Sequence, residues 1–165
     1  MAVTNQKSTE YTNATASQVV NLAPHEFHGR VRVAFFTHAQ SGAGDATSDV
    51  TLCKLPAGKV RLLLGSSFMY VNWTTSSATL DLGWGAYTDI NGDAVVADPN
   101  GLIDGLSVDT AGLYSGEDLV TALTQATGGT KVFESQSGVT LVATSQDTAI
   151  ADGDDLVGYV LYVVD

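Results

Sequence analysis

Apolar and polar residues alternate with a period of two along several short stretches, and this pattern constrains the fold more than any other feature of the chain. In residues 29–36, valines and a phenylalanine occupy one side and arginines and an alanine the other. Successive side chains of a strand point to opposite faces, so the pattern predicts a strand with one buried face. Similar runs occur in residues 50–64 and 139–164. The chain also has nineteen Val and nineteen Thr, residues whose branched side chains favour a pleated sheet, so an all-β fold is expected.

Turn residues divide these runs. The triplet Pro56-Ala57-Gly58 fits a type I turn that would join strands 50–55 and 59–64 as a hairpin. The pair Asn91-Gly92 predicts a type I′ hairpin, with positive φ at both positions. Residues 98–116 are predicted to be a long connection, and residues 117–125 are the one plausible helix.

Short strands with turns between them predict an antiparallel β-sandwich, most economically a jelly roll. The final run, LVGYVLYVV, is apolar on both faces and is therefore expected in the middle of a sheet or against a neighbour. The alternation predicts mostly buried positions at Val31, Val33, Leu62, Leu64, Leu82, Val142, Tyr159 and Leu161.

The 165 residues fit one domain with a short surplus. Residues 1–24 are polar and lack an apolar period, which predicts an extended N-terminal arm before a sandwich domain at residues 25–165. The arm's apolar group Val19, Val20 and Leu22 could pin it to a partner. No apolar run approaches the roughly 20 residues of a membrane span, and the polar start argues against a secretory signal.

Charge is unevenly distributed along the chain. The formal net charge is −11, which disfavours direct binding to nucleic acid. Residues 1–61 carry six cations and four acids, whereas residues 62–165 carry fourteen acids and Lys131 alone. Acidic surfaces commonly serve solubility, but this asymmetry also suits a basic edge that docks on an acidic partner.

No catalytic, cofactor or metal site is indicated. The single cysteine, Cys53, fits core packing better than nucleophilic catalysis. The segment His25-Glu26-Phe27-His28 lacks the helical spacing of a zinc motif. Residues 89–93 resemble the start of a calcium loop but are already explained as a hairpin, and residues 152–155 are expected to be a solvated turn. Aromatic residues that could stack on sugar rings leave carbohydrate binding open as a minority interpretation: Phe68, Tyr70, Trp73, Trp84, Tyr87 and Tyr114.

Four strings carry a family resemblance: KLPAGKVRLLLGSS, TLDLGWGAYTDINGDAVVADPNGL, TGGTKVFESQSGVTLVATS and DDLVGYVLYVVD. Together they resemble the small virion structural proteins of tailed bacteriophages, especially marine and cyanobacterial phages. The similarity covers about residues 28–165 and consists of composition and order, with no catalytic signature.

The resemblance implies a non-enzymatic capsid decoration (cement) protein that is made in the host cytoplasm and binds the exterior of the phage head. It also implies the major capsid protein as partner and a homotrimer, without cofactor, membrane or direct nucleic-acid binding. The alternative is a host-surface carbohydrate-binding fibre or a tail-associated β-sandwich module. From the residues themselves, the candidates for partner binding are Val19, Val20, Leu22, Arg30, Arg32, Lys54, Lys59 and Arg61.

Overall fold

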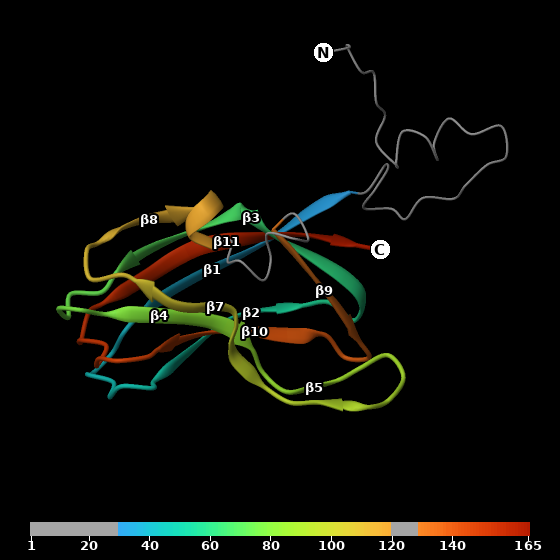
Figure 1. Cartoon of the computed structure of the whole chain (residues 1–165), viewed down its shortest axis with the longest axis horizontal. Coiled ribbons are helices and arrows are strands. Elements are labelled where there is room, and N and C mark those ends of the chain that lie inside the picture. The colour runs from blue at the N-terminus through green and yellow to red at the C-terminus, as the bar shows by residue number, and fades with distance from the viewer. Residues whose placement is uncertain (1–29, 120–128) are drawn as a thin grey trace, which may run out of the picture.

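In the computed structural model, which describes residues 30–119 and 129–165, two antiparallel sheets pack face to face (Figure 1). The first sheet has the order β1-β11-β3-β8, with β9 also paired to β3, and the second has the order β2-β10-β4-β7. The first contains β1 (Val31–Ala39), β11 (Asp155–Val164), β3 (Gly58–Asn72), β8 (Gly112–Ser115) and β9 (Thr130–Ser135). The second contains β2 (Asp49–Leu55), β10 (Val139–Ser145), β4 (Thr79–Trp84) and β7 (Asp98–Ser107).

This strand order confirms the predicted sandwich and has the form of a jelly roll. The chain passes from one sheet to the other at β1–β2, β2–β3 and β3–β4, and again at β7–β8, β9–β10 and β10–β11. The loops β1–β2, β3–β4, β7–β8 and β10–β11 lie together at one end of the sandwich, and the C-terminus lies at the other (Figure 1). The apolar strand β11 sits between β1 and β3, in the middle of its sheet as expected.

The core lies between the two inner faces. Leu62, Leu64 and Leu82 are almost fully buried there, as predicted. Along β3 the inward positions change from Val60, Leu62 and Leu64 to Met69 and Val71, so the strand must contain an irregularity. Ser67 stabilises it, because its Oγ accepts the Leu161 N–H at 3.0 Å and donates to the Leu63 carbonyl at 2.8 Å.

Two of the predicted core positions are wrong. Val31 and Val33 are exposed, and the inner face of β1 belongs instead to Phe36 and the partly buried Ala34. Both sides of this strand carry apolar residues, so alternation alone did not identify the inner one. Three other predicted positions are mostly but not fully buried, because their strand neighbours face the core: Val142, Tyr159 and Leu161.

The predicted long connection at residues 98–116 is also wrong, because β7 and β8 lie within it. Strand β9 was not predicted. Of the predicted helix, the structure describes only the 3₁₀ turn η1 (Gly116–Leu119), and residues 120–128 lie outside the described residues. The predicted arm at residues 1–24 lies outside them as well.

The turns differ in detail from the prediction. Strands β2 and β3 belong to different sheets, so the turn before Gly58 (φ +100°) carries the chain between sheets and closes no hairpin. A hairpin does form between β5 (Tyr87–Thr88) and β6 (Ala94–Val95), but only Gly92 has a positive φ. The Asp89 carboxylate accepts the Asn91 and Asp93 N–H groups, each at 2.8 Å, and so fixes a turn other than type I′.

Candidate interaction surface

The outer face of the first sheet is unusually apolar. Phe35 in β1 is 72% exposed, and Leu113 in β8 is 61% exposed. Between them, Val157 and Tyr70 are exposed directly opposite one another in β11 and β3. In a typical sandwich the outward positions are polar, so this face requires an explanation beyond folding of the single chain.

Three aromatic rings form a row across this face. Tyr159 in β11 lies opposite both Phe35 in β1 and Phe68 in β3. Its ring packs edge to face on both, with centroids 5.7 Å from Phe35 and 4.4 Å from Phe68. Edge-to-face pairs of this kind hold rings in fixed orientations, so the surface they form is preorganised. We call the following set the aromatic face: Val33, Phe35, Phe68, Tyr70, Leu113 and Tyr159.

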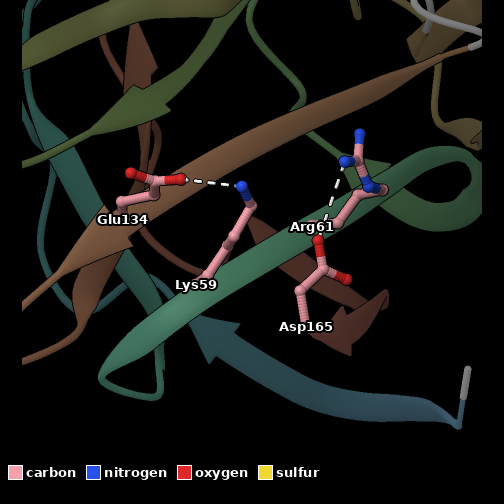
Figure 2. A network of polar contacts seen from close by, with 4 residues as sticks. All are labelled: Lys59, Arg61, Glu134 and Asp165. Atoms are coloured by element: carbon pink, nitrogen blue, oxygen red, sulfur yellow. Dashed lines mark ion pairs between the residues drawn. The ribbon is translucent and has the colours of Figure 1, made fainter. Parts of the chain in front are cut away.

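Two ion pairs lie on the same sheet, near the start of β3, and join Lys59 to Glu134 and Arg61 to Asp165 (Figure 2). Lys59 Nζ lies 2.9 Å from Glu134 Oε1, and both side chains are about half exposed. Arg61 lies 3.6 Å from the carboxylate of Asp165. The Asp165 side chain is nearly buried, so this second pair is better shielded from solvent than the first.

The structure brings the five described candidate cations to one end of the sandwich. Val163 in β11 lies opposite Val31 in β1 and Arg61 in β3, which places the starts of β1 and β3 at the same end of the first sheet, on either side of β11. Lys54 precedes the turn into β3 from the other sheet. We call this region the cationic end, and it contains Arg30, Arg32, Lys54, Lys59 and Arg61. Three further candidates lie outside the described residues: Val19, Val20 and Leu22.

The opposite end is acidic. Its loops and the adjoining strand starts contain no Lys or Arg among residues 30–119 and 129–165, but they contain seven aspartates. At the cationic end, by contrast, acids such as Glu134 and Asp165 are balanced by the cations. The asymmetry seen along the sequence thus becomes an asymmetry along the sandwich. The seven residues of this acidic end are Asp45, Asp49, Asp109, Asp147, Asp152, Asp154 and Asp155.

The described residues offer little for catalysis. Burial raises the pKa of the Cys53 thiol to about 11, so the thiol is protonated and weakly nucleophilic at neutral pH. Among the described residues, no group of three or more His, Cys, Asp or Glu side chains is placed to hold a metal ion. In the same part of the chain, no helix is long and apolar enough to cross a membrane.

A cavity of about 430 Å³ lies on the outer side of the second sheet. Its lining includes Asp81, Thr144 and Gln146 together with the apolar residues Val142 and Pro99. Burial raises the pKa of Asp81, whose Oδ1 accepts the Gly105 N–H at 2.7 Å. The Asp81 carboxylate is thus a hydrogen-bond acceptor for the backbone, and this contact alone does not indicate a catalytic role.

Sequence reasoning missed the aromatic face, although one signal pointed to it. Phe35 and Phe36 are adjacent in a strand, so one of the two rings must point away from the core. Strand β11 repeats this property, since it is apolar on both faces. A two-sided apolar strand in a two-layer sandwich indicates a second contact on its outer side.

No family model matches the chain, and no curated protein matches it either. Among solved structures, it is similar to a chain of a structure described as the cyanophage Pam1 capsid asymmetric unit. That match has 15% identity and a TM-score of 0.54, and it covers 92% of this chain and 98% of that one. At this identity the similarity establishes the fold alone.

Two weaker similarities involve infectious bursal disease virus. The structure of its Gt strain matches with 12% identity and a TM-score of 0.45, and the crystal structure of its VP2 subviral particle with 11% identity and a TM-score of 0.40. Each match covers 82% of this chain but only 32% of the viral one. At these TM-scores they support no argument about this chain.

Proposed function

We propose that this chain is a non-enzymatic virion structural protein, namely a capsid decoration protein that binds the exterior of a tailed-phage head as a homotrimer. The observation that carries the proposal is the fold shared with a chain from a cyanophage capsid. That likeness extends over 92% of this chain and 98% of that one. The tailed-phage family resemblance of the sequence supports the same assignment.

The surface of the molecule suits this role. A decoration protein needs contact area and rigidity, and no chemistry. By binding the assembled shell and not its separate subunits, it stabilises the shell through mass action. The described residues supply a preorganised apolar face and two ends of different charge, both of which favour oriented attachment.

We place the cationic end toward the major capsid protein. Arg30, Arg32 and Lys54 are exposed there, and none of them forms an ion pair among the described residues. They are therefore available to an acidic partner, whereas Lys59 and Arg61 already have acidic partners of their own. The arm's Val19, Val20 and Leu22 are proposed to add apolar contacts to the same partner.

Attachment to particles tests the proposal. Heads of the cognate phage that lack the protein are mixed with purified wild-type chain and imaged by electron cryomicroscopy. We expect added density on the outer surface of the head, and deletion of residues 2–20 should weaken it while leaving the sandwich folded. Density confined to the collar or tail, or binding to host glycans without binding to heads, would favour the fibre or tail alternative.

A matched pair of charge variants tests the orientation. Combining Arg30→Gln, Arg32→Gln and Lys54→Gln removes three positive charges at the cationic end and should weaken attachment. The control adds three negative charges among exposed residues of the acidic end, through Ser41→Glu, Thr110→Glu and Ala149→Glu. Both variants shift the net charge by the same amount, so equal weakening would contradict a specific role for the cationic end.

A further inference from the structure

The aromatic face is an interaction surface without a partner in the described part of the chain. Phe35 and Leu113 lie on strands at opposite sides of the first sheet, so the exposed apolar area crosses the whole sheet. Soluble monomers rarely expose a contiguous apolar patch of more than a few hundred Å². The rings of Phe35, Tyr159 and Phe68 already hold one another in edge-to-face contact, so covering them would cost little side-chain entropy.

The distribution of charge on the chain favours a second copy of the same chain as the partner of the aromatic face. The chain carries a formal charge of −11, so two copies repel each other wherever their acidic surfaces approach. The outer side of the first sheet avoids this repulsion. Glu134 and Asp165 at its border are each paired with a cation, and the positions between Val33 and Leu113 named in the aromatic face carry no charge. It is therefore a neutral surface through which copies of this acidic chain can meet.

We infer that the aromatic face is the contact between copies of this chain in its homo-oligomer. The inference rests on the proposed function in taking a homo-oligomer as the working form. The face runs along the side of the sandwich, whereas the cationic and acidic ends lie at its extremities (Figure 1). Contact through the sides of neighbouring copies thus leaves every cationic end free for another partner.

Single lysine substitutions on the purified full-length chain test this inference. Phe35→Lys and Leu113→Lys each place a charge in the proposed contact, on strands β1 and β8 respectively. Val96→Lys is the matched control, because Val96 is 78% exposed and lies outside the first sheet. All three residues are exposed, so far-UV circular dichroism should report the same fold for each variant.

Sedimentation velocity at micromolar concentration gives the result. We expect an oligomer for wild type and for Val96→Lys, and a dissociation constant raised about tenfold or more for Phe35→Lys and Leu113→Lys. A wild-type chain that sediments only as a monomer overturns the inference. So does an oligomer that tolerates both face variants as well as it tolerates the control.

Particle attachment, measured separately, distinguishes the two proposals. A chain that is monomeric in solution and on the head, yet decorates it fully, overturns the contact between copies and leaves the decoration role intact. An oligomer that breaks at the aromatic face but never binds heads supports the contact and overturns the decoration role.

Discussion

Asp154 binds Thr74 across the acidic end of the sandwich, accepting the Thr74 backbone N–H at 3.1 Å and its hydroxyl at 2.8 Å. The same carboxylate accepts the Ala151 N–H at 2.8 Å and is only 1% exposed. It therefore ties the β3–β4 loop to the β10–β11 loop. The expectation of a solvated turn at residues 152–155 was wrong for Asp154, because its carboxylate is a buried structural acceptor.

Asp154→Ala is expected to lower the free energy of unfolding by about 1–3 kcal/mol, since it removes the hydrogen bonds by which one carboxylate connects the two loops. Urea denaturation monitored by circular dichroism measures the loss. Asp152→Ala is the control, because the exposed Asp152 carboxylate accepts one N–H, from Gly42 at 2.7 Å. Equal losses in the two variants would show that burial of the Asp154 contacts contributes nothing.

The orientation of β1 gives a second prediction. Phe36 is 5% exposed in the core, whereas its neighbour Phe35 points outward. Phe36→Ala should therefore cost about 3–5 kcal/mol of unfolding free energy. Phe35→Ala should cost about 1 kcal/mol or less when measured at a concentration low enough to keep the chain monomeric. A larger loss for Phe35→Ala than for Phe36→Ala would mean that Val31, Val33 and Phe35 form the inner face of β1, as the sequence predicted.

That strand shows where sequence reasoning succeeds and where it stops. Period-two alternation was enough to predict β1, β2, the first part of β3, β10 and β11, and the sandwich to which they belong. It chose the wrong face of β1 because Val31, Val33 and Phe35 are as apolar as the core residues. The sequence shows which side chains are apolar. It does not show whether an apolar side chain is covered by the rest of its own chain or by a second molecule.

Strand β7 was missed for a different reason. Its pairing with β4 shifts register twice, so no simple alternation survives in its sequence DPNGLIDGLS. The close fit between the two strands depends on Gly83 in β4. A Cβ at Gly83 would lie 1.9 Å from the Asp98 carbonyl oxygen, so any residue other than glycine would clash with the β7 backbone. The need for glycine at position 83 comes from β7, which is distant in the sequence, so the residues around Gly83 do not reveal it.

Gly83→Ala should consequently destabilise the fold by about 1–3 kcal/mol, because β7 must move away from β4. Gly85→Ala is the matched control two residues later. Its added Cβ would meet only the Thr140 Cβ at 3.9 Å, an ordinary contact, so its effect should stay within about 0.5 kcal/mol. Thermal and urea unfolding of the two variants provide the comparison, and similar stabilities would contradict the tight β4–β7 packing.

Asp81 gives a prediction that depends on pH. Burial, together with repulsion from Asp104 and Asp147, raises the pKa of Asp81, although the Gly105 N–H opposes the shift. The folded chain thus holds this proton more tightly than the unfolded chain does. The stability contributed by Asp81 is complete below the unfolded pKa and is lost as pH rises through the higher folded pKa.

Asp81→Asn keeps an oxygen that can accept the Gly105 N–H but removes the buried charge. We expect the variant to be more stable than wild type at pH 7, and the difference to shrink as the pH falls into the range where Asp81 itself becomes protonated. Urea unfolding of both proteins across this range measures the difference. Asp104→Asn, which removes only a neighbouring charge at an exposed position, should give a smaller gain. An Asp81→Asn protein that is less stable at pH 7 would mean that the bond from Gly105 to the ionised carboxylate outweighs the cost of burying its charge.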